Sequence, residues 1–146
     1  MTKIYVDPDI EKAETLPAVF YRSNSYFDEL KEKVFVKSWQ FVGHESILPI
    51  NINTYPFEFI KNYIEEPLLL VKNEDEKIIC LSNVCTHRAN ILINNKGNVR
   101  DLRCMYHGRK FNLDGTFKSM PEFSLAKEFP RDLSLIHISE PTRPMN

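Results

Sequence analysis

Two short segments of the chain each carry one cysteine and one histidine, side chains that bind soft and borderline transition metals. The first segment has the pattern Cys85-x-His87 and the second the pattern Cys104-x-x-His107. Residues 88 to 103 lie between them. Together the segments supply two thiolates and two imidazoles, which is enough for one tetrahedral zinc ion or for a cluster of two irons.

The distribution of ligand types between the segments favours one of these alternatives. Zinc fingers usually group two cysteines on one segment and two histidines on the other, whereas here each segment carries one of each. A [2Fe–2S] cluster of the Rieske type has one iron bound by two cysteines and one bound by two histidines. The sequence therefore predicts one such cluster per chain, bound by Cys85, His87, Cys104 and His107, with Gly108 directly after the last ligand. A zinc-stabilised interaction module is the alternative.

Composition bounds the class of protein. The chain has 146 residues and a net charge of −1, which allows one domain with a real core and gives no reason to expect nucleic acid or an anionic membrane as partner. No apolar run approaches the roughly 20 residues that span a bilayer, and the polar, acidic start lacks the apolar part of a secretory signal. We therefore expect a cytoplasmic protein. The third cysteine, Cys80, is expected to be a small buried hydrophobe.

Periodicity predicts a helical beginning and a β-rich remainder. Residues 1–20 have no sustained period and predict an extended arm, and apolar spacing of three and four predicts a helix from Ser25, its N-cap, to about Lys37. A strand is predicted over residues 39–42, with Trp39 in the core. The predicted parts are residues 1–40 as arm and helix, 41–130 as the cluster domain, and 131–146 as a truncation point and tail.

Short strands follow, with turn residues between them. Alternation over residues 55–59 and apolar runs over 67–71 and 78–84 predict three strands. Turns are predicted at 73–76, at 94–98 with Gly97 able to take a positive φ, and at 113–116 around the Asp114-Gly115 pair. This spacing predicts a small antiparallel β-domain. The candidate ligands then fall on two loops, 85–91 and 104–108, beyond strand ends.

The last residues are different in kind. The run from Leu133 to Arg143 matches, residue for residue, the translation of a transposase sequencing adapter. We interpret residues 133–146 as adapter-derived and leave them out of the predicted fold. His137 is then excluded as a candidate ligand.

The chain around the two segments resembles the N-terminal part of the large (α) subunit of Rieske non-haem iron oxygenases, the group that includes aromatic-ring-hydroxylating dioxygenases. The likeness covers about residues 12–130 and includes the stretches 39–44 and 111–116 as well as the ligand segments. Two positions depart from the family pattern: Ala89 stands where glycine is usual, and Arg109 where tryptophan is usual. The resemblance implies a mainly β fold, a Rieske-type antiparallel β-sandwich with two cluster-binding loops, preceded by an N-terminal helix.

The resemblance also implies a function. The intact protein would be an O₂-dependent mono- or dioxygenase, in which a ferredoxin or flavin reductase passes electrons to the Rieske cluster and the cluster relays them to a mononuclear Fe(II). The family further implies a ring-shaped, trimer-type homo-oligomer, with the substrate, an aromatic ring or a quaternary amine, left open.

The histidine count places the mononuclear iron outside this fragment. The chain has four histidines. His87 and His107 serve the cluster and His137 lies in the tail, so only His44 remains for a site that needs two histidines and a carboxylate. We therefore expect no catalytic residue here and a mononuclear Fe(II) only in a missing C-terminal domain. A stand-alone Rieske ferredoxin, an electron carrier, is the alternative, although such ferredoxins begin almost at the first strand.

Overall fold

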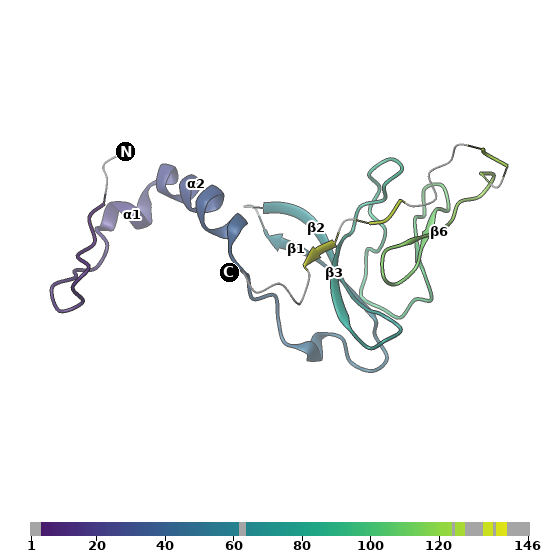
Figure 1. The fold of residues 1–146 in the computed structure, drawn as a ribbon, viewed down its shortest axis with the longest axis horizontal. Helices are drawn as coiled ribbons and strands as arrows, with labels where there is room; N and C mark the ends of the chain where they lie inside the picture. The colour runs from purple at the N-terminus through teal and green to yellow at the C-terminus, as the bar shows by residue number, and fades with distance from the viewer. Residues whose placement is uncertain (1–3, 62–63, 124, 128–132, 136, 140–146) are drawn as a thin grey trace. The chain divides into compact units, whose positions relative to one another are not determined.

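The computed structural model describes residues 4–61, 64–123, 125–127, 133–135 and 137–139. The chain divides into two compact units, Met1–Val42 and Gly43–Asn146. The ribbon in Figure 1 has both α-helices in the first unit and the strands in the second. Within the described residues, no helix has the length and apolar character needed to cross a bilayer.

The N-terminal unit contains an arm and two short helices. These are α1 (Ala18–Arg22), α2 (Asn24–Lys33) and a 3₁₀ turn, η1 (Phe35–Lys37). The predicted helix was wrong in three respects: α1 was not expected, the residue before α2 is Ser23 and not Ser25, and α2 ends at Lys33. The β-branched side chains of Val34 and Val36 lose rotamer freedom in a helix, which explains the early end.

The segment that follows the helices does not form the predicted strand. Residues 39–42 have no ladder partner in the described part of the chain. Trp39, predicted to lie in the core, is 65% exposed, and Phe41 is 90% exposed. Apolar and β-branched residues favour a strand only where a neighbouring strand supplies hydrogen bonds and a packing face, and no strand of the described residues pairs with this segment.

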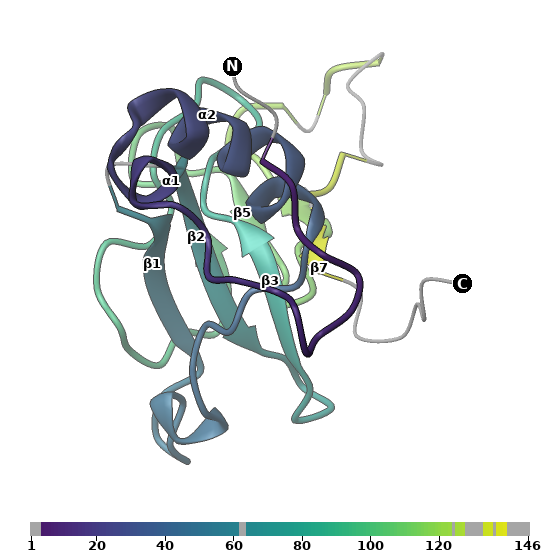
Figure 2. The same cartoon turned by 90° about the vertical axis from the view of Figure 1, so that its left-hand side faces the viewer.

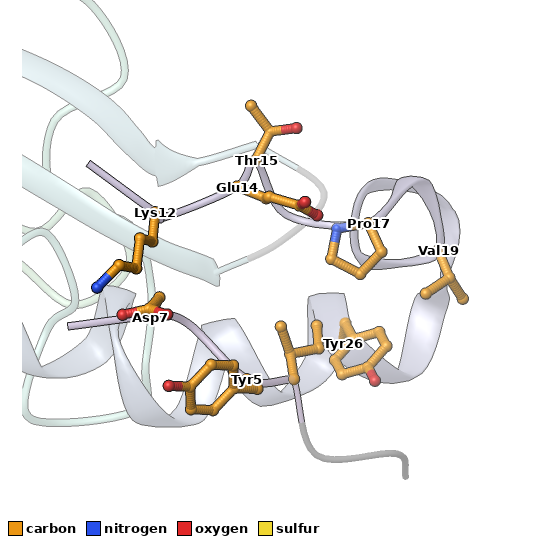
Figure 3. Close-up of a pocket in the computed structure, with 9 residues that line it drawn as sticks. Tyr5, Asp7, Lys12, Glu14, Thr15, Pro17, Val19 and Tyr26 are labelled. Atoms are coloured by element: carbon orange, nitrogen blue, oxygen red, sulfur yellow. The ribbon is translucent and has the colours of Figure 1, made fainter. Parts of the chain in front are cut away.

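A hollow of about 510 Å³ lies within the N-terminal unit. Figure 3 shows its lining, in which Tyr5, Lys12 and Tyr26 come from the arm and from α2. The Lys12 ammonium lies 2.9 Å from the Asp9 carboxylate, but both side chains are exposed, and exposed ion pairs contribute little to the stability of a fold. None of the four candidate ligands lines this hollow.

The first sheet of the second unit is antiparallel and follows chain order. Its strands are β1 (Thr54–Ile60), β2 (Ile64–Lys72), β3 (Ile78–Ser82) and β7 (His137–Ser139), in the order β1-β2-β3-β7. Figure 2 shows β1, β2 and β3 side by side. Pro67, which has no N–H to donate, pairs with Glu58 beside a register shift in β1, one of the positions a sheet tolerates. The three strands predicted over residues 55–84 are confirmed.

A second, three-stranded sheet carries the later loops. Its strands are β4 (Leu102–Arg103), β5 (Lys110–Phe111) and β6 (Phe117–Ser119), in the order β4-β5-β6. Both sheets contribute to one apolar cluster, made of Leu69, Val71, Leu81, Cys85, Leu92, Leu102, Cys104, Phe111 and Leu135. The predicted fold class, a mainly β domain of antiparallel sheets after a short helical start, is confirmed.

The turns are partly as predicted. Asn73 Oδ1 accepts the backbone N–H groups of Asp75 and Lys77 at 3.0 Å each, which closes the turn after β2. Gly115 has φ 85°, and a Cβ there would lie 3.2 Å from a Leu81 methyl group, so both conformation and space require glycine. The segment 94–98 was predicted as a turn with Gly97 able to take a positive φ; in the structure the φ of Gly97 is not positive, and Gly97 bridges Thr54 in an antiparallel pair.

The end of the chain takes part in this fold. The Leu135 N–H donates to the Gly115 carbonyl at 2.8 Å, and the Leu135 side chain is 1% exposed within the apolar cluster. Strand β7 pairs with β3 at Cys80 and Leu81. Leaving these residues out of the fold was therefore wrong, while their adapter origin stays a prediction. Residue 136, residues 140–146 and the predicted truncation point 131–132 lie outside the described residues.

Candidate metal centre

The two loops that carry the candidate ligands share one backbone design. In the first loop, the Cys85 carbonyl accepts the Ala89 N–H at 3.0 Å, and the Cys85 N–H donates to the Asn90 carbonyl at 2.8 Å. Ala89 has φ 52°, a left-handed conformation that is strained for any residue with a Cβ. The loop is thus a tight turn whose fifth residue would be better as glycine.

The second loop repeats these contacts at equivalent positions. The Cys104 carbonyl accepts the Gly108 N–H at 3.0 Å, and the Cys104 N–H donates to the Arg109 carbonyl at 2.8 Å. Gly108 has φ 74° and stands where the first loop has Ala89. The histidine is the third residue of the first loop and the fourth of the second, so one design presents two different spacings.

Two asparagines hold the connection between the loops. The Asn83 side chain, which is buried, donates to the Ile93 carbonyl at 2.7 Å and accepts the Ile93 N–H at 3.0 Å. Asn53 makes the same pair of bonds with Val99, at 2.7 and 2.9 Å. Each side-chain amide therefore makes the two hydrogen bonds that a neighbouring strand would otherwise make with one residue of this irregular segment. This fixes both the exit from β3 towards Cys85 and the approach to β4.

The two cysteines lie at the inner ends of the loops. Cys85 and Cys104 are each 2% exposed and belong to the apolar cluster beside Leu102 and Phe111. Cys104 directly follows β4, and Cys85 follows the bridge residue Val84. The rigid sheets therefore place both sulfur atoms, as a preformed metal site requires.

The two imidazoles lie towards the surface. The ring centroids of His87 and His107 are 4.8 Å apart, with an interplanar angle of 71°. His87 is half-buried and His107 is exposed. The Tyr106 ring lies 3.8 Å from the His107 ring and is itself 58% exposed. The imidazole pair thus forms the outer side of the site and the thiol pair the inner side.

The two thiols differ in acidity because different hydrogen-bond donors and charges surround each sulfur atom. Burial raises the pKa of Cys85, and the neighbouring Cys104 raises it further, against the His87 N–H and the Arg109 charge. Burial would also raise the pKa of Cys104, but backbone N–H groups of Tyr106 and His107 donate to its sulfur, as do side chains of Cys85 and Asn90, and the net effect is to lower it. Cys104 is therefore the better-prepared thiolate, the form that binds metal.

The first histidine is held in its neutral form. Desolvation lowers the pKa of His87, and the positive charges of Arg109, His107 and Arg88 lower it further. Metal binding requires a neutral imidazole with a free nitrogen lone pair. The electrostatics of the loop therefore favour the ligand form of His87 at neutral pH.

The donor set fits a cluster of two irons. Like ligands lie together, with the two thiols hydrogen-bonded to each other and the two imidazoles in edge contact. In the described residues, no three His, Cys, Asp or Glu side chains converge on a point that could hold one metal ion. A [2Fe–2S] cluster of the Rieske type asks for this separation into a thiolate pair and an imidazole pair.

The structure adds one residue that the sequence did not single out as part of the site. Arg109 is 3% exposed, and its Nη1 donates to Thr86 Oγ1, in the first loop, at 2.9 Å. One signal was present in the sequence: Arg109 stands two residues before the apolar Phe111, and residues two apart in an extended segment share a face. Because buried arginines are rare, the charge of Arg109 predicted an exposed side chain instead.

The remaining predicted positions behave as ordinary structural residues. His44 Nδ1 accepts the Ser46 N–H at 3.2 Å and so caps the 3₁₀ turn η2 (Glu45–Ile47). Cys80 is 6% exposed and free, as a small buried hydrophobe should be. His137 lies in β7, and its side chain falls outside what the structure describes.

Comparison with known proteins agrees with this geometry. A model of the Rieske [2Fe–2S] domain matches residues 38–130. The carnitine monooxygenase oxygenase subunit of Escherichia coli (strain K12) is 38% identical over 106 residues, which cover 72% of this chain and 27% of that protein. The biphenyl dioxygenase subunit alpha of Metapseudomonas furukawaii is 32% identical over 115 residues, which cover 77% of this chain and 24% of that protein.

Solved structures give the same result. The crystal structure of a quaternary ammonium Rieske monooxygenase with a bound inhibitor has a TM-score of 0.72 at 27% identity, and covers 84% of this chain and 34% of that one. Naphthalene 1,2-dioxygenase, at 21% identity and a TM-score of 0.70, shares the fold. The chain thus spans about a quarter to a third of the proteins it matches.

Two antiparallel sheets that support two facing Cys/His loops define a β-domain built to hold an iron–sulfur cluster between its loops. The match over residues 38–130 makes the assignment specific: the chain belongs to the Rieske [2Fe–2S] domain family.

Proposed function

We propose that this chain is the electron-transfer part of a Rieske oxygenase α subunit. Cys85 and Cys104 would bind one iron of the [2Fe–2S] cluster as thiolates, and His87 and His107 would bind the other through one ring nitrogen each. The observation that carries the proposal is the pairing of like ligands, thiols inward and imidazoles outward. When bound, the cluster accepts and releases one electron at a time.

The chain's own residues set how electrons reach and leave this site. The thiol side is closed by the apolar cluster around Phe111, which excludes water from the sulfur atoms. The imidazole side is open, because His107 is exposed. With a cluster bound, the imidazole edges of His87 and His107 would therefore be the side of the site open to an electron-transfer partner. Asn90, whose Nδ2 lies 3.7 Å from Cys104 Sγ, holds that sulfur in place from the other loop.

The role of the whole protein follows from its relatives. Relatives of this chain are oxygenase subunits, among them a carnitine monooxygenase and a biphenyl dioxygenase. We assign the intact protein to the O₂-dependent mono- or dioxygenases, with a ferredoxin or flavin reductase as electron donor and a mononuclear Fe(II) in a domain beyond this chain. The likeness to the quaternary ammonium monooxygenase covers 84% of the chain, more than residues 38–130 account for, which supports an oxygenase subunit over a ferredoxin.

Assembly and location complete the proposal. One structure of a quaternary ammonium Rieske monooxygenase is described as revealing inter-subunit electron transfer. We place this protein in the cytoplasm and propose a trimer-type homo-oligomer, in which the exposed His107 edge faces a neighbouring subunit. A full-length gene product that is monomeric by sedimentation, yet oxygenates at full rate, would contradict this assembly.

The cluster itself is tested with the full chain. After anaerobic reconstitution, we expect two irons and two acid-labile sulfides per chain and a visible charge-transfer spectrum. Cys104→Ser and His107→Asn should lose this spectrum, while Cys80→Ala, a change at the one cysteine outside the loops, should keep it. A colourless chain that carries one zinc would refute the proposal.

A further inference from the structure

Arg109 occupies an unusual place for a charged side chain. It directly follows the second loop and is 3% exposed. Its guanidinium donates to Thr86 Oγ1 at 2.9 Å and, through Nε and Nη2, to Met120 Sδ at 3.4 Å. Its Cζ atom lies 5.9 Å from the centre of the Phe117 ring, within the range of a cation–π contact. A side chain of this charge is buried only where specific contacts hold it.

These contacts join three parts of the site. Thr86 lies between the candidate ligands Cys85 and His87, so the bond from Arg109 reaches the middle of the first loop. The Arg109 carbonyl accepts the Cys104 N–H at 2.8 Å, which closes the second loop. Met120 follows β6. Arg109 therefore fixes the spacing of the two loops with its side chain and the shape of the second loop with its backbone carbonyl.

The position also matters electrically. Arginine keeps its charge at all pH values a protein survives, and a buried charge is screened far less than an exposed one. The Arg109 guanidinium is hydrogen-bonded to Thr86, the residue between Cys85 and His87, so its charge lies beside ligand positions of both types. The same charge acts on an electron added between these ligands, and attraction favours the reduced state.

We propose that Arg109 is a positioning residue of the cluster: it ties the first ligand loop to the second, and its buried charge stabilises the reduced state. The inference rests on the proposed function, because it concerns the same [2Fe–2S] site. Arg109 donates no electron and binds no iron. It acts on the cluster through Thr86 and through its electric field.

The test is a midpoint potential, measured by voltammetry on the reconstituted full chain. Arg109→Met removes the charge and keeps the length of the side chain. It should lower the equilibrium constant for one-electron reduction of the cluster about tenfold, which corresponds to a midpoint potential lower by 59 mV. Arg109→Lys keeps the charge and should stay within about threefold of the wild type. Arg103→Met is the matched control, because Arg103 is an exposed arginine directly before Cys104 and should change the constant less than about twofold.

The tie between the loops is tested separately by the rate at which a chelator bleaches the cluster. Thr86→Val removes the hydroxyl acceptor and leaves the charge, so the cluster should be lost about tenfold faster with a nearly unchanged midpoint. Arg109→Lys should also bleach faster, because ammonium lacks the guanidinium fork. Wild-type midpoints and bleaching rates in all of these variants would overturn the proposal.

If the Arg109→Met variant does not take up the cluster, the Thr86→Val and Arg109→Lys variants test the proposal. If both of them bleach at the wild-type rate and keep the wild-type midpoint, Arg109 is not a positioning residue. Failure of the proposed function has a different result, since the wild-type chain itself would then carry no iron and no sulfide. A loaded wild type with indifferent variants refutes only the role of Arg109.

Discussion

The two ligand loops allow a paired test in which one exchange stabilises and the reverse exchange destabilises. Ala89 and Gly108 occupy equivalent positions, with φ of 52° and 74°. A left-handed conformation costs a residue with a Cβ about 1–2 kcal/mol, whereas a glycine makes the unfolded chain more flexible, at a cost of about 0.4–1 kcal/mol. Ala89→Gly should therefore raise the free energy of unfolding by about 0.5–1 kcal/mol.

Gly108→Ala should have the opposite and larger effect. The new Cβ would meet Pro121 Cγ at 3.0 Å, closer than side chains normally approach. Strain and overpacking together exceed the entropic gain, and we expect the free energy of unfolding to fall by about 2 kcal/mol. With a urea m-value of about 2 kcal/mol per molar, the midpoints should shift by about +0.4 M for Ala89→Gly and about −1 M for Gly108→Ala.

The assay is anaerobic urea unfolding of the loaded full chain, followed by far-ultraviolet circular dichroism and by visible absorbance. Gly97→Ala is the matched control, because a Cβ at Gly97 would meet nothing within 4 Å and its φ is not positive. Its midpoint should not fall. Equal midpoints for Gly108→Ala and Gly97→Ala, or a lower midpoint for Ala89→Gly, would refute the assignment of the two loops to one strained design.

Three further predictions concern the support of the site. Asn83→Ala leaves both backbone groups of Ile93 without their side-chain partner, and urea unfolding should show a loss of about 2–4 kcal/mol. Leu135→Ala should cost about 2–5 kcal/mol, and an unchanged urea midpoint would mean that residues 133–139 do not pack as described. Burial raises the pKa of Cys80 to about 11 from 9.0, so the folded state keeps a proton that the unfolded state releases, and the free energy of unfolding should fall as pH rises between these values. Cys80→Ala should remove that decline, which midpoints measured across this pH range will check.

Much of the fold followed from local pattern. Alternation around Phe57 corresponds to β1, and the two apolar runs correspond to β2 and β3, because short apolar segments between turn residues are typical of strands. The Asp114-Gly115 pair marked a turn, since few residues other than glycine tolerate its φ. The helical start was less accurate: the pattern located α2 but not its ends, and a five-residue helix such as α1 has too few turns to show a period.

The identities and spacing of Cys85, His87, Cys104 and His107 by themselves predicted a [2Fe–2S] cluster over a zinc ion, because the preference of each metal for ligand types follows from side-chain chemistry. Only the tertiary structure decided that the thiols face the core while the imidazoles face outward, and that Arg109 lies buried against the first loop. Such placements depend on contacts between residues far apart in the chain, which no local pattern encodes. Trp39 shows the limit of local pattern: its apolar character predicted burial, but its side chain is 65% exposed.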